Sequence, residues 1–273
     1  MTCKAVFEGH ADAVGAVSIS QKTATYTSKN AVVISGGSDK ILKRWSLQPV
    51  FRSKTGKVVT CSASHSVRAH DKDINCVAIA PNDAMVASAS QDKSIRLWTS
   101  AELSPLASLK GHKRGVWKVC FSNVDKCLAS SSSDRTVKLW SVTDFTCLHT
   151  FEGHTASVLA VKFINHGQQL LSSSSDGLIR LWTIRTGECN STFDEHDNRI
   201  WALTVQGSRL FTGDSDGKIV LWEDATEEEE QLRLEELEKT LLIEQQLKND
   251  LKNKRYDKVG HHLFWCDMRT TLS

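Results

Sequence analysis

The sequence predicts an all-β fold in which one unit occurs five times and a single α-helix follows. Residues 111–140, GHKRGVWKVCFSNVDKCLASSSSDRTVKLW, open on Gly-His and close on Lys-Leu-Trp, and the same pattern recurs at 153–182. Looser copies occupy 9–45, 69–98 and 195–222, and the last four repeat histidines are spaced 42 residues apart. A period near ~40–45 residues with this start and end is typical of β-propeller blades.

The first half of each repeat predicts a strand with one buried side. The fourth and seventh residues after the repeat histidine are apolar in all five copies, as Val116 and Val119 are in the third. Apolar residues that keep their place while neighbours change are expected on the buried face of a strand. The position directly after the first of them varies freely, so we expect it to face the surface. It is occupied by Gly15, Asn75, Trp117, Leu159 and Trp201.

The second half of each repeat carries a fixed set of polar residues before a tryptophan. An aspartate stands six residues before the Trp, and a Ser or Thr stands four residues before that aspartate. The aspartate favours a tight turn, because its side chain can bond its own backbone. With the repeat histidine, these residues form five predicted tetrads: His10, Ser35, Asp39 and Trp45; His70, Ser88, Asp92 and Trp98; His112, Ser130, Asp134 and Trp140; His154, Ser172, Asp176 and Trp182; His196, Thr212, Asp216 and Trp222.

Histidine, serine and aspartate together also suggest a hydrolytic triad. A nucleophilic serine needs one exposed, activated position beside a base. Here the set occurs five times at similar spacing and always with a tryptophan. A buried Asp–His–Ser/Thr–Trp hydrogen-bond network would satisfy all of these polar groups. We therefore interpret the tetrads as structural, and we predict a protein that is not an enzyme, with no catalytic residue, no cofactor and no metal site.

The pattern of residues 1–222 stops after Trp222. Residues 223–258 hold twelve acidic and seven basic residues without Gly or Pro, which favours a charged amphipathic helix. This helix is either a solvated linker, or it docks onto a partner or onto a further helical domain, as the start of a helical C-terminal domain. Residues 259–273 form a divergent tail, in which His261, His262 and Cys266 are too loosely grouped to predict a metal site.

Charge, cysteine content and hydropathy limit the classes of protein to which the chain can belong. The net charge of +2 is the sum of about −5 over residues 223–258 and about +7 over the repeats. The positive charge of the repeats predicts a mild preference for anionic partners. The eight cysteines form no CxxC pair, so we expect free thiols in a reducing, intracellular setting. No apolar run approaches a membrane span, and the start MTCKAVFEGH lacks the apolar core of a signal peptide.

The strings GH…LASSSSDRTVKLW and GH…LLSSSSDGLIRLW resemble the WD40 repeat family, although no Asp follows the Trp in any copy. The resemblance covers residues 1–222. It implies four-stranded antiparallel blades arranged radially around a channel, and it implies nothing direct about chemistry.

Further strings are similar to a narrower group, the U3 small nucleolar RNA-associated WD40 subunits of the small-subunit processome. They are HDKDINCVAIAPND, LKGHKRGVWKVCFS, FEGHTASVLAVKF and the exit EEEEQLRLEELEKTLL. This resemblance implies a scaffold in the nucleolus of the nucleus that supports pre-rRNA processing and 18S rRNA maturation. The implied partners are other WD40 subunits of the UTP-B complex and the U3 snoRNA/pre-rRNA ribonucleoprotein. Members of this group carry two propellers and a helical C-terminal domain, so the chain resembles only their later part.

Two alternatives come from other classes. One is a WD40 substrate receptor of a cullin-type ubiquitin ligase, whose Trp-Asp-x-Arg motif is only partly matched by Trp182-Thr-Ile-Arg185. The other is a generic signalling scaffold.

The number of blades leaves two architectures open, since five repeats are present where the family usually has seven. Ala5–Phe7, in KAVFEGH, aligns with the predicted fourth strands in LASLKGH and LHTFEGH. This segment either completes the last blade and closes a ring, or belongs to an open arc of a larger propeller, which we favour. The first repeat also contains an insertion near Lys22–Lys29 and a longer loop near Pro49–His65.

We expect partner-binding residues where the first strand of each repeat begins, because Trp and Arg dominate interface energetics. Simple packing at the rim is the alternative for the two tryptophans. The predicted partner-binding residues are Asp73, Asn75, Arg114, Trp117, Arg199 and Trp201. A second candidate is a basic stripe two residues before the Trp, either a solvated strand face or a phosphate contact. Its members are Lys43, Arg96, Lys138 and Arg180.

Overall fold

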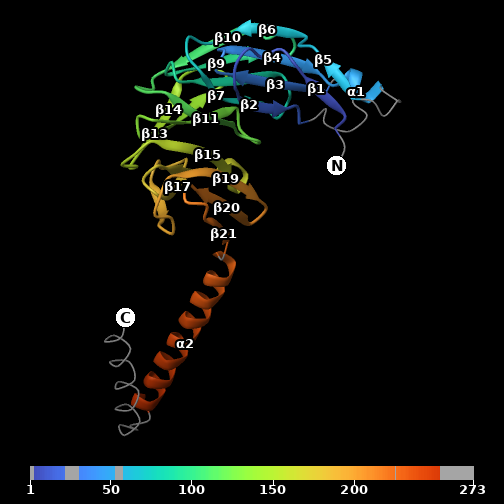
Figure 1. Ribbon diagram of the computed structural model, residues 1–273. Helices are drawn as coiled ribbons and strands as arrows, with labels where there is room; N and C mark the ends of the chain where they lie inside the picture. The colour runs from blue at the N-terminus through green and yellow to red at the C-terminus, as the bar shows by residue number, and fades with distance from the viewer. Residues whose placement is uncertain (1–2, 22–30, 53–57, 225, 253–273) are drawn as a thin grey trace. The chain divides into compact units, whose positions relative to one another are not determined.

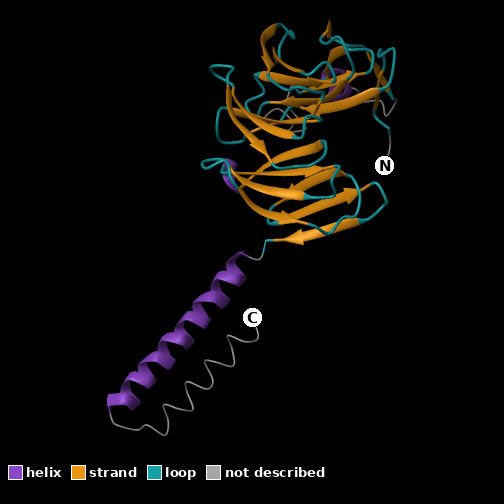
Figure 2. Cartoon of the chain, turned by 90° about the vertical axis from the view of Figure 1, so that its left-hand side faces the viewer, coloured by secondary structure: helices purple, strands orange, loops and turns teal. Residues whose placement is uncertain are grey.

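The computed structural model describes residues 3–21, 31–52, 58–224 and 226–252. Contacts divide the chain into two units, Met1–Trp222 and Glu223–Ser273. The described residues of the first unit form strands and two short helical segments, α1 (Gln48–Arg52) and the 3₁₀ turn η1 (Asn165–Gly167), as Figures 1 and 2 show.

Each repeat folds into its own sheet, which we call a blade and number in chain order. Blade 1 contains β2 (Val14–Ile19), β3 (Val32–Gly37), β4 (Ile41–Ser46) and β6 (His65–Arg68). Blade 2 contains β7 (Ile74–Ile79), β8 (Met85–Ser90), β9 (Ser94–Thr99) and β10 (Pro105–Lys110). Blade 3 contains β11 (Val116–Phe121), β12 (Cys127–Ser132), β13 (Thr136–Ser141) and β14 (Cys147–Glu152).

Blade 4 contains β15 (Val158–Ile164), β16 (Gln169–Ser174), β17 (Ile179–Thr183) and β18 (Cys189–Phe193). Blade 5 has three strands among the described residues, β19 (Ile200–Gln206), β20 (Arg209–Asp214) and β21 (Ile219–Glu223). Paired strands within a blade are antiparallel, as blade 3 illustrates, because short connections join consecutive strands. The prediction of an all-β propeller-type fold is therefore confirmed.

The hydrophobic core lies between blades. The leading face of a blade, which we define as the side facing the preceding blade, packs onto the trailing face of that neighbour. Between blades 1 and 2, for example, Ile34 and Leu42 pack with Ile74 and Val77. The other junctions are built in the same way, with clusters shared by blades 2 and 3, 3 and 4, and 4 and 5. Each inner blade is therefore apolar on both faces.

The N-terminal strand does not close a ring. Strand β1 (Ala5–Phe7) pairs in parallel with β5 (Val59–Cys61), and blade 5 is left without a fourth strand among the described residues. The alternative in which Ala5–Phe7 completes the last blade is therefore wrong for this structure. The longer loop of the first repeat supplies β5, the strand with which β1 pairs. The insertion near Lys22–Lys29 lies outside the described residues.

The second unit contains α2 (Thr226–Lys252), where a helix was expected. Several of its leucines are well exposed, including Leu234 and Leu237. The expected continuation to residue 258, the tail and its His261, His262 and Cys266 lie outside the described residues. None of the described helices is both long and apolar enough to span a membrane. The seven cysteines in the described part of the chain are free thiols.

Candidate functional site

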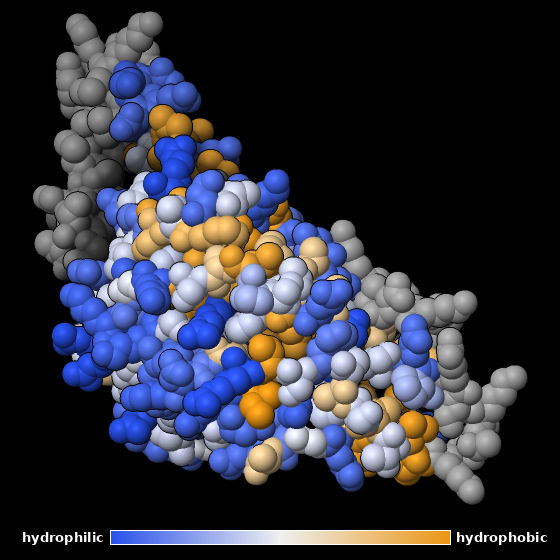
Figure 3. Space-filling model, turned by 90° about the horizontal axis from the view of Figure 1, so that it is seen from above, coloured by the Kyte–Doolittle hydropathy of each residue, from blue (hydrophilic) through white to orange (hydrophobic). Residues whose placement is uncertain are grey.

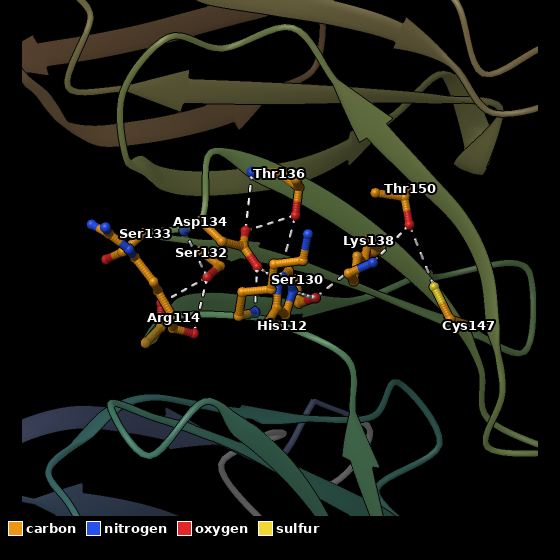
Figure 4. Close-up of polar contacts among 12 residues, drawn as sticks. His112, Arg114, Ser130, Ser132, Ser133, Asp134, Thr136, Lys138, Cys147 and Thr150 are labelled. Atoms are coloured by element: carbon orange, nitrogen blue, oxygen red, sulfur yellow. Dashed lines mark hydrogen bonds and ion pairs between the residues drawn. The ribbon is translucent and has the colours of Figure 1, made fainter.

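Each tetrad connects the loop before a blade to two of its strands, and the third repeat shows the arrangement (Figure 4). His112 Nδ1 lies 2.8 Å from Asp134 Oδ2, and His112 Nε2 lies 2.8 Å from Ser130 Oγ. The Trp140 indole N–H donates to the same Ser130 oxygen at 2.8 Å. Asp134 also accepts a backbone N–H from Lys113 at 2.8 Å. One buried serine therefore joins the tryptophan of the third strand to the histidine of the preceding loop.

The directions of these hydrogen bonds follow from which groups can donate. An indole nitrogen only donates, so Ser130 Oγ accepts from Trp140. An ionised carboxylate only accepts, so His112 Nδ1 carries a proton and donates it to Asp134, and Nε2 of the neutral ring accepts from Ser130. Burial raises the pKa of the Asp134 carboxyl, but hydrogen bonds from His112 and Thr136 outweigh it and hold that pKa well below 3.8. A neutral histidine with an ionised aspartate satisfies every polar group of the tetrad.

Blades 1, 2 and 4 repeat this geometry with the predicted residues. The histidine–aspartate distances there are 2.8, 2.9 and 3.0 Å. The corresponding histidine–serine distances are 2.7, 2.7 and 2.8 Å. Their tryptophan N–H groups reach the serine oxygen at 2.7–2.9 Å.

The fifth tetrad corrects the sequence prediction. His196 Nδ1 contacts Asp214 at 2.7 Å, whereas the predicted Asp216 accepts a hydrogen bond from Asn198 at 2.9 Å. In blades 2 to 4 the residue two before the tetrad aspartate is a serine that caps the turn, as Ser132 does for the Asp134 N–H. Blade 5 has Asp214 there. This longer acidic side chain still caps the turn, accepting from the Asp216 N–H at 3.0 Å, and also reaches the histidine.

The tetrad serines lack the exposed position that a nucleophile needs. Ser88, Ser130 and Ser172 are fully buried and each already accepts a tryptophan N–H. A shallow cavity of about 340 Å³ between blades 2 and 3 contains Cys127, but burial raises the pKa of this thiol to about 11. A thiol with so high a pKa is a poor nucleophile at neutral pH. No group of three potential metal ligands occurs among the described residues.

The freely varying position of each repeat is a β-bulge. The pairing of the first strand with the second shifts by one residue between Val116 and Lys118, and likewise in every other blade. A bulge inserts one extra residue and redirects its side chain. The spacing of three between the buried Val116 and Val119 is the sequence signal for it, because same-face residues of a regular strand are two apart. The sequence prediction included the variable position but not the bulge.

The bulges bring the two predicted rim tryptophans together. Trp117 of blade 3 and Trp201 of blade 5 pack edge to face, with ring centroids 5.8 Å apart and an interplanar angle of 83°. Leu159, at the bulge of blade 4, is buried. Trp117 is half-buried and donates to Ser133 Oγ at 2.7 Å, whereas Trp201 remains 49% exposed. Of this pair, Trp201 therefore offers the larger apolar surface to a partner.

The other predicted contact residues divide into two kinds. Asp73, Arg114 and Arg199 are exposed, as a binding role needs. Asn75 is instead half-buried and donates to the Val116 carbonyl at 2.8 Å, which connects blades 2 and 3. It contributes to the packing of the blades rather than to a free surface.

The basic stripe folds back onto the neighbouring strand. The ammonium group of Lys138 donates to Thr150 at 2.8 Å, and that of Lys43 donates to Ser66 at 3.3 Å. The guanidinium group of Arg180 lies 5.9 Å from the Trp182 ring centroid. The fourth member, Arg96, is half-buried with a buried Nε. Three members of the stripe are half-buried and Lys43 is buried, so these side chains pack within their blades as well as facing solvent.

Comparison with known proteins agrees with this architecture. The family described as WD40 (WD domain, G-beta repeat) matches residues 1–46, 60–99, 103–141, 145–183 and 187–223. Transducin beta-like protein 3 of Rattus norvegicus is 42% identical over 102 residues, which are 36% of this chain and 12% of that protein. U3 small nucleolar RNA-associated protein 13 of Saccharomyces cerevisiae is 37% identical over 96 residues, 34% of this chain and 11% of that protein.

Protein transport protein sec13 of Aspergillus fumigatus is 35% identical over 75 residues, 26% of this chain and 22% of that protein. The matched part is thus less than a quarter of each of these relatives. The five family matches, in contrast, cover the five blades and their tetrads. The chain belongs to the WD40 repeat family.

Proposed function

We propose that the chain acts as a non-catalytic scaffold in a U3 small nucleolar RNA-associated assembly, the small-subunit processome, and supports pre-rRNA processing and 18S rRNA maturation there. The similarity to U3 small nucleolar RNA-associated protein 13 and to transducin beta-like protein 3 supports this assignment. The partners we propose are other WD40 subunits of the UTP-B type and the U3 snoRNA/pre-rRNA ribonucleoprotein. The location that follows is the nucleolus.

One observation supports the scaffold role. The histidine, serine or threonine, and aspartate that could form a catalytic triad instead hold the strands of each blade together. Histidine, hydroxyl and carboxylate are committed to one another and to a tryptophan in all five blades. Binding must then come from exposed side chains that the rigid blades display.

We assign partner binding to a rim surface made of Trp117, Trp201, Arg114 and Arg199. Trp201 is half-exposed and both arginines are exposed. Trp and Arg are the residue types most often found where truncation abolishes binding. Because Trp117 holds the ring of Trp201 from one side, Trp201 is preorganised and loses little rotamer entropy when a partner covers it.

Affinity purification of the tagged chain from nuclear extract tests this proposal. We expect co-purification of WD40 subunits and U3 RNA, together with a nucleolar signal in cells. Recovery of a cullin adaptor without U3 RNA would instead identify a ubiquitin-ligase receptor.

A variant locates the contact. Trp201→Ala should weaken the association by about 30-fold, since a central anchor contributes about 2 kcal/mol or more. Leu148→Ala is the matched control, because Leu148 is 55% exposed on the outer strand of blade 3. Equal loss with both variants, or no loss with Trp201→Ala, rules out the rim surface.

A further inference from the structure

The surface of the blades is polar over most of its area, but its charge is unevenly distributed. Figure 3 shows hydrophilic side chains over most of one face of the molecule, with apolar side chains between them. Polarity therefore distinguishes no region of this surface. The sign of the charge, in contrast, differs between equivalent positions of the five repeats.

Blade 3 carries three basic residues, Lys113, Arg114 and Arg135, which we call the basic corner. Lys113 and Arg114 directly follow the repeat histidine, and Arg135 directly follows the tetrad aspartate. The formal charge of these three positions is +3 in blade 3, but 0, +1, 0 and −1 in blades 1, 2, 4 and 5. The equivalent residues in those four blades are Ala11, Asp12 and Lys40; Asp71, Lys72 and Lys93; Thr155, Ala156 and Gly177; Asp197, Asn198 and Gly217.

Hydrogen bonds hold the two segments of the basic corner together. Asp134 accepts the backbone N–H of Lys113 at 2.8 Å. The Ser132 hydroxyl lies 3.2 Å from the Arg114 carbonyl oxygen and 2.9 Å from that of Gly115 (Figure 4). The backbone that carries the three basic side chains is therefore fixed, so a ligand would not have to order a loop when it binds.

The charges of the basic corner are available to a ligand. All three side chains are exposed, and none of them forms an ion pair or a hydrogen bond with another described residue. The adjacent acid, Asp134, is turned inward, because its side chain is 6% exposed and accepts hydrogen bonds from His112 and Thr136. Three positive charges without an ion-pair partner therefore face solvent and attract anions.

The small extent of the basic corner favours a peptide over a nucleic-acid strand. The turn of blade 2 lies close on one side, since a Cβ added to Gly115 would be 3.2 Å from Gln91 Cα. Blade 2 mixes Lys72 with the exposed acids Asp71 and Asp73, and the equivalent loop positions of blade 4 are uncharged. A nucleic-acid strand needs a continuous basic track for its evenly spaced phosphates. A few adjacent carboxylates need only a corner of this size.

We propose that the basic corner binds a short acidic segment of a protein partner, whose anionic side chains pair with Lys113, Arg114 and Arg135. Each guanidinium group can donate two parallel N–H bonds to one carboxylate. The same donors suit a phosphorylated side chain, so the shared chemistry is a cluster of anionic oxygens on a peptide. This inference rests on the proposed scaffold role, because Arg114 also belongs to the rim surface.

Fluorescence anisotropy with the full chain tests this inference. The probes are a labelled peptide with a run of glutamates, one with phosphoserines in their place, a matched glutamine peptide, and a single-stranded oligouridine of the same net charge. We expect an anionic peptide to bind more tightly than the oligouridine, and the glutamine peptide not to bind. The anionic peptide that binds more tightly shows whether the partner supplies carboxylates or phosphates. Tighter binding of the oligouridine, or no binding of either anionic peptide, would overturn the inference.

Substitutions locate the site. Lys113→Gln, Arg114→Gln and Arg135→Gly should each weaken peptide binding about fivefold, the upper range for an exposed ion pair, and the triple variant should lose it. Glycine suits position 135 because the backbone φ there is 72°. Lys126→Gln is the matched control, since Lys126 is an exposed lysine of the same blade, in the loop between β11 and β12. An equal loss in this control would reveal a general effect of net charge and would contradict the basic corner.

The inference and the proposed processome role can fail separately. If the purified chain binds neither anionic peptide, the basic corner is not a peptide site, while co-purification of WD40 subunits and U3 RNA is unaffected. If co-purification fails but peptide binding persists and depends on the basic corner, the processome role is wrong and the peptide site remains. Circular dichroism should be unchanged in every variant, because each substituted side chain is exposed.

Discussion

His196 Nδ1 lies 2.7 Å from Asp214, two residues before the aspartate that the repeat pattern selects. Both side chains of this pair are almost fully buried. The contact shows that the tetrad is defined by where a carboxylate can reach the histidine, and not by a fixed count from the tryptophan.

Replacing Asp214 with Ala should therefore destabilise blade 5 far more than replacing Asp216. Asp214→Ala removes the partner of a buried histidine and the cap of the turn, whereas Asp216→Ala removes one exposed hydrogen bond. Urea unfolding of the two variants gives the comparison. A larger loss of stability from Asp216→Ala would mean that the pattern, and not the observed contact, identifies the tetrad.

Ser130→Ala should lower the free energy of unfolding by about 1–3 kcal/mol, because it leaves both Trp140 Nε1 and His112 Nε2 buried without a partner. The neighbouring Ser131 provides the control. It is equally buried, but its hydroxyl has no hydrogen-bond partner, so Ser131→Ala should be neutral or stabilising. Chemical denaturation of both variants measures the difference, and equal effects would contradict the role of Ser130 as the junction of the tetrad.

Stability should fall as the pH is lowered, in two ranges. Burial lowers the pKa of His70 below 6.5, although the Asp92 carboxylate opposes this shift. Below pH 6.5 the unfolded chain therefore takes up a proton that the folded chain does not, and this favours unfolding. Burial raises the pKa of Asp92, but hydrogen bonds from Ser94 and His70 outweigh it and bring that pKa to about 2. The stability due to Asp92 is present above pH 3.8 and is lost as the pH falls towards 2.

Urea midpoints measured across this pH range test both shifts. His70→Gln should flatten the dependence below pH 6.5, because it removes the buried histidine that resists protonation in the folded chain. An unchanged slope in the His70→Gln variant would mean that His70 does not titrate differently in the folded and unfolded chain.

The rim and core tryptophans should differ in their effect on stability. Trp182 is 1% exposed, and Trp182→Ala should cost about 3–5 kcal/mol through the cavity it leaves. Trp201→Ala should cost much less, because half of this side chain already faces solvent. Denaturant unfolding followed by far-UV circular dichroism compares them. Similar losses would place Trp201 in the core and remove it as a binding residue.

The tetrads show how much of the site could be predicted from the sequence. His112, Ser130, Asp134 and Trp140 were predicted as a set, because a hydrogen-bond network that recurs in every blade leaves the same residues at the same spacing. Asp214 was not predicted, since the pattern of the other repeats placed the carboxylate at Asp216. The reach of a side chain across a turn depends on the backbone path, which spacing alone does not describe.

The exposure of individual side chains also depended on the tertiary structure and could not be predicted from the repeat pattern. The exposure of Trp201 and the half-burial of Trp117 follow from two bulges that bring residues 84 positions apart into contact. Likewise, Val17 and Val119 occupy equivalent positions in the sequence, but only the blade in front of Val119 buries it.

The sequence by itself determined the five repeats, four complete tetrads, most of the fifth and the helix that follows, because these depend on local spacing and propensity. Only the tertiary structure decided which carboxylate completes the fifth tetrad, which rim side chains meet, and that β1 pairs with β5. Those outcomes depend on which residues lie close together in the fold although they are distant in the sequence. Burial and pairing are properties of neighbours, and repeats with the same pattern become different where a neighbour is missing.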